Sequence, residues 1–591
     1  MPDDVYDLRG LAFSLQGVLD VLLAEAGADM PVTPVVELLP TTRPEHGDLA
    51  SNVALISAKH AKRPPRELAA ALGERWLSGP GAGVCDRVEV AGPGFLNLFL
   101  SDGWYHGALR RLLAEGADYG RGCLPAARRR KINVEFVSVN PTGPLHVGHA
   151  RYASYGDALC RIFAFAGHDV TREFYVNDYG TQMLRFGQSL AARYGQRLGL
   201  DAPVPEEGYK GDYLLALADE LIAVVADRYR PALEAAALDV ERLPRDVLDE
   251  LRVWGRDAIL AQFRRTLERL RVSFDVWTPE SSLYAGEAVR RGFGGEVGKA
   301  LADLDGEGLL YEDEGAVWLA TTRYGDDKDR VLIRQTGDPT YFLSDIAYHR
   351  DKLDRGFSHM IDIWGADHHG YVPRMKAAFT ALPPHEPDRL ELIIGQLVNL
   401  IESGEARRMS KRKGDIVTVD DLIEAIGVDA ARFLLVARSQ DTALELDIDV
   451  AVQKSNDNPV YYVQYAHARI CSILRTLRER GRVSDDGGQR GRYDADASAA
   501  RVSVSLYERA LLRALARFPE VVLDAATQRA PHRLHNYLGD LAAEFHVFYR
   551  HCRVLSDDAA VAAFRSALCS ATRSVLAAGL GLLGVSAPES M

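Results

Sequence analysis

Cysteine is scarce in this sequence, and the few cysteines are scattered. No two of them are close enough to form a Cys-x-x-Cys metal knuckle or a dense disulfide framework. We therefore expect reduced, mostly buried thiols in a reducing compartment, with no structural zinc and no other resident metal. The six cysteines among the 591 residues are Cys85, Cys123, Cys160, Cys471, Cys552 and Cys569.

Long hydrophobic runs are also missing. No stretch approaches the roughly 20 uninterrupted apolar residues that a membrane helix needs. Residues 1–17 carry acidic side chains before any apolar run and have no basic segment, which argues against a secretory signal. These absences predict a cytoplasmic protein with no membrane partner.

Basic residues are outnumbered, with 70 Lys and Arg against 83 Asp and Glu and a net charge of −13. Proteins that bind nucleic acid usually present a basic surface. Any contact with RNA must therefore come from local patches, such as the basic runs at 128–131 and 407–413. Each run taken alone could equally be a solvated face.

The length and the 47% of hydrophobic residues are sufficient for three or four separate cores. The first part of the chain alternates helical patterns with short strand-like runs, which predicts a small α/β domain over 1–115. After about Asn456 strand signals vanish, and Ala, Leu and Arg recur at helical spacing. An all-α helical bundle is therefore expected over 456–591.

The middle of the chain predicts a Rossmann-type parallel sheet. Residues 133–139 read as a strand, 149–166 as a helix stopped by a glycine, and 170–176 as a second strand. This order places a ligand crevice at the carboxyl ends of the strands. We expect this α/β domain over 128–400, with a mainly helical insertion around 184–271. Further strand-like runs occur at 317–321, 331–334, 360–364 and 392–394.

Two motifs suggest chemistry on a polyphosphate. His146, Gly148 and His149 lie where the first strand leads into its helix, so N–H groups and imidazoles can face phosphates while the glycine admits adenosine. Far downstream, Arg408-Met-Ser-Lys411-Arg-Lys-Gly is a basic loop within a connecting region expected over 401–455. Lys411 would neutralise charge on pyrophosphate as a carboxylate attacks the α-phosphate. Alone, either motif could be an ordinary loop.

In this order the two motifs resemble the HIGH and KMSK signatures of class I aminoacyl-tRNA synthetases. Arg408 stands where the first signature lysine is expected and Arg412 where the final serine is, whereas Lys411 keeps the place of the second lysine. Arginine keeps the charge but not the reach of an ammonium group, so the role of Arg408 stays open. The resemblance implies an enzyme that uses ATP with Mg²⁺, with His146, His149 and Lys411 as its catalytic residues.

Acidic residues near the expected crevice bear on which amino acid is activated. A planar guanidinium is best paired by carboxylates, because two parallel N–H···O bonds fit one carboxylate. Glu135, Glu280 and Asp345 are candidates, although most acids simply solubilise the surface.

The stretch from Glu135 to His149 is similar to the arginyl-tRNA synthetase form of the first signature. This resemblance implies that Glu135 and Asn140 hold the α-amino and carboxylate end of arginine. It also implies that Tyr341 and Asp345 line the side-chain pocket, with Glu280 as a further guanidinium partner.

Residues 364–371 are similar to the bacterial form of the family's adenosine and substrate wall. Some members carry glutamine where this chain has His368 or His369, and His368 is the one assigned to arginine. The ATP-binding residues that the resemblance implies are Gly148, Gly365, Asp367, Gln396, Val398, Arg408, Met409 and Ser410.

The resemblance extends over essentially the whole chain and implies contacts with tRNA. The N-terminal domain would grip the outer corner of tRNA at the D-loop, the connecting region its stem, and the bundle its anticodon. Aromatics interleaved with arginines suit unstacked bases, although Tyr461, Tyr462 and Tyr465 also have the spacing of a core face. The implied tRNA-binding residues are Phe95, Asn97, Tyr465, Arg469, Tyr549, Arg553 and Met591.

The resemblance therefore implies a member of the arginyl-tRNA synthetases of the bacterial type, expected to act as a monomer on L-arginine, ATP and tRNA(Arg). We expect bound tRNA to be needed before arginine is activated, as it is in most of the family. Three alternatives are less well supported. A cysteinyl enzyme would need zinc-binding cysteines, a non-catalytic tRNA-binding paralogue has no use for His146, His149 and Lys411 together, and a nucleotidyltransferase leaves the helical bundle unexplained.

Overall fold

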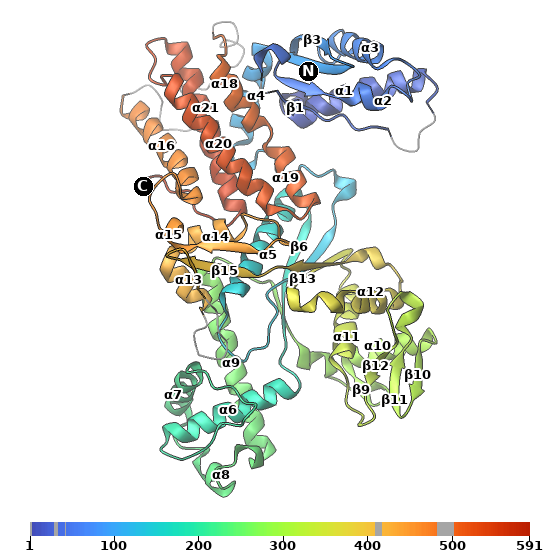
Figure 1. Ribbon diagram of the computed structural model, residues 1–591, viewed down its shortest axis with the longest axis vertical. Coiled ribbons are helices and arrows are strands. Elements are labelled where there is room, and N and C mark those ends of the chain that lie inside the picture. Colours follow the sequence, from blue (N-terminus) through green and yellow to red (C-terminus); the bar gives the residue numbers. More distant parts are fainter. Residues whose placement is uncertain (1–2, 29–32, 42, 408–416, 481–501) are drawn as a thin grey trace. The chain divides into compact units, whose positions relative to one another are not determined.

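The computed structural model describes residues 3–28, 33–41, 43–407, 417–480 and 502–591 (Figure 1). The chain forms two compact units, Met1–Leu124 with Lys454–Met591 and Pro125–Gln453. Within the described ranges, no helix is both long enough and apolar enough to cross a membrane.

A five-stranded parallel sheet is the centre of the Pro125–Gln453 unit. Across the sheet the strands are β14 (Leu390–Gly395), β13 (His359–Gly365), β5 (Lys131–Glu135), β6 (Asp169–Val176) and β7 (Val276–Pro279). The central strand β5 comes first along the chain. The chain then adds β6 and β7 on one side of it and later adds β13 and β14 on the other side, so the strand order reverses between β5 and β13. In such sheets ligands bind at the carboxyl ends of the strands beside this reversal.

The predicted strand, helix and second strand at the start of this unit are all present. β5 is shorter than predicted because the chain leaves the sheet after Glu135, and Val137 has a left-handed φ of 71° that a strand cannot accommodate. Helix α5 (Val147–Ala166) begins two residues earlier than predicted because His146 caps it. Gly167 ends the helix with a φ of 114°, a conformation that glycine adopts without strain.

Two of the predicted strand runs lie outside the parallel sheet. β11 (Ala316–Leu319) and β12 (Arg330–Ile333) pair antiparallel, and β10 (Leu310–Asp313) completes their separate sheet. The fifth parallel strand is instead β7, which is not among the predicted strands. Short apolar runs look alike in parallel and antiparallel sheets, so the sequence pattern does not identify their partners.

Helices and short strands complete this unit. Four helices lie between β6 and β7 along the chain, namely α6 (Thr181–Arg197), α7 (Tyr213–Val225), α8 (Arg230–Ala235) and α9 (Arg245–Arg269). The other elements are β8 (Ala288–Arg290), β9 (Phe293–Gly294), α10 (Gly295–Gly306), α11 (Tyr341–Asp354), α12 (Val372–Ala381), β15 (Val398–Glu402), β16 (Glu405–Arg407), α13 (Val419–Ile426), α14 (Val428–Leu435), β17 (Leu444–Asp447) and α15 (Ile448–Ala451).

The other unit combines an antiparallel sheet with a helical bundle, as predicted. The sheet has the order β1-β2-β4-β3, and the bundle follows in the last part of the chain. The first group of elements is α1 (Leu8–Glu25), β1 (Leu39–Pro40), β2 (Leu49–Ser51), α2 (Val53–Ser57), α3 (Pro65–Leu77), β3 (Cys85–Ala91), β4 (Phe95–Leu100) and α4 (Asp102–Glu115). The bundle comprises α16 (Pro459–Glu479), α18 (Leu506–Ala516), α19 (Phe518–Thr527), α20 (Pro531–His551) and α21 (Ala559–Leu582).

Charged contacts join these two parts of the unit. Asp48 is buried and pairs with Arg513 of the bundle, while its other carboxylate oxygen accepts the Leu100 N–H at 2.8 Å. Arg509 donates to Asp102 of α4 at 2.7 Å. The two ends of the chain therefore pack as one body. The predicted fold class, a Rossmann-type α/β domain with a small α/β domain and an all-α bundle, is confirmed.

Candidate active site

The two histidines of the first motif stack at the start of α5. His146 accepts the Gly148 N–H on Nδ1 at 3.2 Å and donates its own backbone N–H to Nδ1 of His149 at 3.1 Å. The ring centroids lie 3.6 Å apart. Because Nδ1 accepts a hydrogen bond in both rings, a neutral imidazole at either position carries its proton on Nε2. Both rings can therefore donate to an anion from Nε2.

The segment that follows the second motif is hydrogen-bonded to this histidine turn. Val147 donates its N–H to the Val417 carbonyl at 3.0 Å, and Val419 donates to the Leu145 carbonyl at 2.9 Å. The preceding strand β16 pairs antiparallel with β15. Four predicted residues of the motif, Arg408, Met409, Ser410 and Lys411, lie outside the described residues. The structure thus brings the flank of that motif to the histidines.

Glu135 lies at the carboxyl end of β5 and is buried. Its Oε2 accepts from the Lys352 ammonium group at 2.7 Å. Burial raises the pKa of Glu135, and the positive charge of Lys352 partly offsets this effect. Asn140 is half-buried in the loop that follows, where its carbonyl accepts the Thr142 N–H at 2.8 Å.

Lys352 is not among the predicted site residues, yet it is the ammonium group that contacts Glu135. It is fully buried on α11 and also donates to Asp362 of β13 at 2.8 Å. Burial disfavours the charged forms of both groups, but the mutual charges prevail and lower the pKa of Asp362. The sequence does hold a signal, because Asp345, His349 and Lys352 are spaced i, i+4 and i+7 and so share one helical face.

Glu280 is a buried carboxylate that directly follows β7. It is 1% exposed, and no cationic side chain among the described residues pairs with it. Burial raises the pKa of Glu280 to about 8. A hydrogen bond from the Ser344 side chain offsets this effect in part, and the negative charges of Asp345 and Asp178 add to it. An unpaired buried carboxylate is costly, so a cationic ligand bound here would be stabilised.

Asp345 and Tyr341 lie on the first turns of α11. Asp345 Oδ2 accepts from the Tyr371 hydroxyl at 2.5 Å, and burial raises the pKa of this aspartate. Tyr341 is 51% exposed, and a Cβ added to Gly180 would lie 2.8 Å from its hydroxyl. Tyr371, from the short helical segment Ala366–Tyr371, is a further polar group that is not among the predicted residues.

Three carboxylates are near enough to Tyr175 of β6 for their charges to act on its hydroxyl. Its hydroxyl is buried and has no hydrogen-bond partner in the part of the chain that the structure describes. Burial raises the pKa of Tyr175, and the charges of Glu280, Asp345 and Glu135 raise it further. The structure therefore brings the predicted arginine-binding acids around one side chain at the carboxyl end of the parallel sheet. Such a site suits a ligand with two positively charged ends.

The predicted adenosine wall begins where β13 ends. A Cβ added to Gly365 would lie 2.6 Å from Oδ1 of Asp367, so a side chain at this position would displace the exposed Asp367 carboxylate. Asp367 and His368 are both exposed, and Nε2 of His368 lies 3.6 Å from a carboxylate oxygen of Asp367. The Trp364 and His368 ring centroids are 6.0 Å apart.

Two further predicted ATP-binding residues, Gln396 and Val398, follow strand β14. The backbone of Gln396 is fixed, because its N–H donates to the Gln440 carbonyl at 2.9 Å and its carbonyl accepts from Arg151 at 2.9 Å. Val398 is buried at the start of β15. Arg151 is not among the predicted residues. It is buried on α5 and donates to four carbonyls, those of Gln396, Leu397, Ser439 and Thr442.

Three predicted tRNA-binding residues of the bundle form one cluster. The Arg469 guanidinium carbon lies 4.6 Å from the Tyr465 ring centroid and 5.0 Å from that of Tyr549. Tyr461 and Tyr462 are half-buried, as is Tyr465, whereas the core face of α16 is formed by its other apolar residues. The rings of these tyrosines are therefore partly accessible at the bundle surface.

The remaining tRNA candidates differ in their exposure. Arg553 follows α20 and is exposed, as is Met591. In the N-terminal domain, Phe95 begins β4 and is exposed, whereas Asn97 is 5% exposed on the same strand. Phe95 thus presents a ring to solvent, and Asn97 packs inside the domain.

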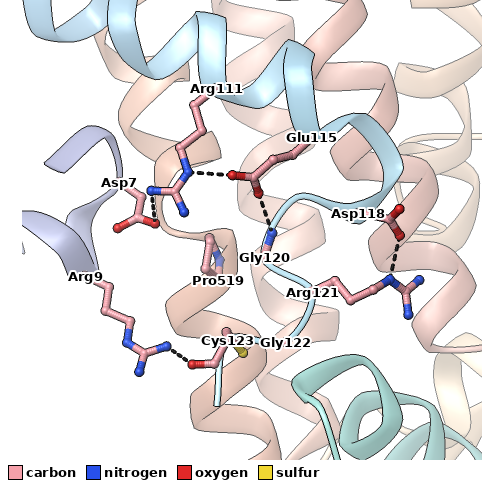
Figure 2. Close-up of a pocket in the computed structure, with 10 residues that line it drawn as sticks. All are labelled: Asp7, Arg9, Arg111, Glu115, Asp118, Gly120, Arg121, Gly122, Cys123 and Pro519. Carbon is pink, nitrogen blue, oxygen red and sulfur yellow. Dashed lines mark hydrogen bonds and ion pairs between the residues drawn. The ribbon is translucent and has the colours of Figure 1, made fainter. Parts of the chain in front are cut away.

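Figure 2 shows a pocket in the unit that contains both chain ends. Its volume is about 500 Å³, and its charged groups are paired. Arg111 pairs with Asp7 and Glu115, Arg121 pairs with Asp118 in the same way, and Arg9 donates to the Cys123 carbonyl. Because its acidic and basic side chains neutralise one another, the pocket does not select an anion.

Comparison with known proteins places this site in context. The family model for the class I (R) tRNA synthetase catalytic domain matches residues 109–471, that for the arginyl-tRNA synthetase N-terminal domain matches 14–100, and that for the DALR anticodon-binding domain matches 463–591. The arginine–tRNA ligase of Moorella thermoacetica is 47% identical, covering 92% of both chains. That of Desulforudis audaxviator is 45% identical, covering 98% of both. The solved structure of Thermus thermophilus arginyl-tRNA synthetase is 25% identical, with a TM-score of 0.70 over 98% of this chain and 100% of that one.

Proposed function

The chain belongs to the class I arginyl-tRNA synthetases, and we propose that it activates L-arginine with Mg-ATP and esterifies it to the 3′ end of tRNA(Arg). One observation carries the choice of amino acid. Glu280 is a buried carboxylate without a cationic partner among the described residues, and the Asp345 carboxylate lies near it. A guanidinium supplies the positive charge and the parallel N–H donors that such a site lacks.

The proposed arginine site has two ends. Glu135 and Asn140 bind the α-amino and carboxylate end, and Glu280 with Asp345 binds the guanidinium. Tyr341 and His368 line the opening of the pocket. The proximity of Glu135, Glu280 and Asp345 to Tyr175 supports this assignment.

The proposed ATP site lies at the start of α5. Nε2–H groups of His146 and His149 donate to phosphate oxygens, and Lys411 stabilises charge as the arginine carboxylate attacks the α-phosphate and pyrophosphate leaves. These three residues act by positioning and electrostatics. Mg²⁺ enters bound to the phosphates of ATP, as is common for this ion. The remaining ATP contacts are assigned to Gly148, Gly365, Asp367, Gln396, Val398, Arg408, Met409 and Ser410.

The proposed tRNA contacts divide along the chain. Residues 1–115 hold the outer corner of tRNA through Phe95 and Asn97, 401–455 contact the stem, and 456–591 read the anticodon. The catalytic domain is assigned to 128–400, with a helical insertion around 184–271. In the anticodon domain the contacts are assigned to Tyr465, Arg469, Tyr549, Arg553 and Met591. The enzyme is proposed to act as a cytoplasmic monomer without structural zinc.

ATP–pyrophosphate exchange with each of the twenty amino acids, with and without total tRNA, tests the proposal. We expect exchange with arginine alone and only when tRNA is present. Exchange with another amino acid would still support a class I aminoacyl-tRNA synthetase but would refute the assignment of the arginine pocket. Absence of exchange under every condition would favour a non-catalytic tRNA-binding protein.

A further inference from the structure

A continuous line of buried charges runs beneath the proposed arginine site. Lys352 Nζ lies 2.7 Å from Glu135 Oε2 and 2.8 Å from Asp362 Oδ1. The other oxygen of Asp362, Oδ2, lies 2.7 Å from Nε2 of His349. All four side chains are buried. Three of them, Lys352, Asp362 and His349, have no part in the mechanism proposed above.

The contacts of His349 determine its protonation state. Nε2 faces the Asp362 carboxylate, and Nδ1 lies 2.7 Å from the backbone carbonyl of Asp345. Both partners can only accept hydrogen bonds when Asp362 is ionised, and a neutral imidazole carries a single N–H. Both contacts are satisfied when His349 is an imidazolium. Two cations, Lys352 and His349, then balance two anions, Glu135 and Asp362.

These charges link three elements of the site. Glu135 ends β5 and Asp362 lies in β13, the two strands at which the strand order reverses. Lys352 and His349 lie on α11, which also carries Asp345. The line of charges therefore fixes α11 against both strands, and with it the separation between the Glu135 and Asp345 carboxylates.

Stability alone does not account for such an arrangement. Well-packed apolar side chains of similar volume often stabilise a protein as much as a buried ion pair or more, because removing charges from water is costly. Charged groups do, however, fix geometry through directional hydrogen bonds. We propose that Lys352, Asp362 and His349 form a positioning triad that sets the distance between the two ends of the arginine site. This inference rests on the proposed function, in which Glu135 and Asp345 bind those two ends.

Selectivity for substrate length is the expected consequence. Homoarginine has the same charged ends as arginine and one more methylene, so a rigid spacing between Glu135 and Asp345 disfavours it. Loosening the triad should weaken arginine binding and reduce the preference of the enzyme for arginine over homoarginine. ATP does not span the two carboxylates, so its KM should change little.

The test is ATP–pyrophosphate exchange with total tRNA for Lys352→Met. We expect the KM for arginine to rise about tenfold or more, since one partner of a buried charge pair is lost. We expect the preference for arginine over homoarginine to fall and the KM for ATP to stay within about twofold. Arg432→Met is the matched control, because Arg432 and Asp157 form another fully buried ion pair in the same unit. It should lower the melting temperature without changing the preference for arginine.

A double variant distinguishes a specific effect on arginine binding from a general loss of folding. Lys352→Met with Asp362→Asn removes one cation and one anion, so it should melt closer to the wild type yet keep the raised KM for arginine. The inference is wrong if Lys352→Met changes neither the KM for arginine nor the preference for arginine over homoarginine. It is also wrong if Arg432→Met changes both quantities to the same extent. Glu135→Gln distinguishes a failure of the triad from a failure of the proposed function. An unchanged KM for arginine in that variant would show that Glu135 does not bind substrate, which overturns the site and the triad together.

Discussion

Arginine binding should release a proton from Glu280 and should therefore strengthen as pH rises. The pKa of this carboxyl group is raised to about 8, so at pH 7 most of the free enzyme carries it neutral. A guanidinium pairs with the ionised form, whose population increases about 25-fold between pH 6.5 and 8.5 for a pKa near 8. The dissociation constant for arginine should fall by a similar factor over that range, because the guanidinium itself stays charged.

Isothermal titration calorimetry of arginine binding tests this prediction without requiring catalysis. Titrations at several pH values, each in buffers of different ionisation enthalpy, give both the affinity and the number of protons released. We expect nearly one proton released at pH 7 and less at pH 8.5. Glu280→Gln, which cannot ionise, should bind more weakly and show a flatter pH dependence. A dissociation constant that stays level from pH 6.5 to 8.5 in the wild type would refute the reasoning.

Three further predictions follow from the same geometry. Glu280→Gln should raise the free energy of unfolding of the ligand-free enzyme at pH 8 by a few kcal/mol, measured by urea unfolding. The reason is that a carboxyl group with a raised pKa destabilises the folded state as pH rises from about 4.5 to 8. An equal stabilisation at pH 4.5 would contradict this. His149→Ala should lower kcat for exchange about 100-fold with little change in the KM for arginine. Arg469→Ala should raise the KM for tRNA in aminoacylation about tenfold, since it contacts Tyr465 and Tyr549; an unchanged KM would remove this cluster from the tRNA site.

Local patterns determined much of the fold and the position of the first motif. The strand that ends at Glu135 and the helix after His146 each have a periodicity or a cap that acts within a few residues, so these elements were predictable. The helical bundle was predictable for the same reason. The enzyme class and its substrate followed from motifs whose residues match a known family, and relatives confirm both.

Pairing between distant segments was decided by the tertiary structure. β7 joins the parallel sheet and β11 does not. The residues of neither strand indicate which strand it pairs with, because pairing depends on which sheet edge the rest of the chain leaves open. Arg151 contacts four carbonyls that are far from it in sequence. No local pattern encodes such contacts.

The electrostatics of the arginine site likewise depend on the folded state. The sequence identified Glu135, Glu280 and Asp345 as acids near a crevice, but a carboxyl pKa is set by burial and by neighbouring charges. The Lys352 ammonium group on α11 pairs with Glu135, whereas Glu280 lacks a cationic partner among the described residues. The sequence therefore determined which groups the site contains. Folding alone decided which of them are charged, because only folding sets their separation and their access to water.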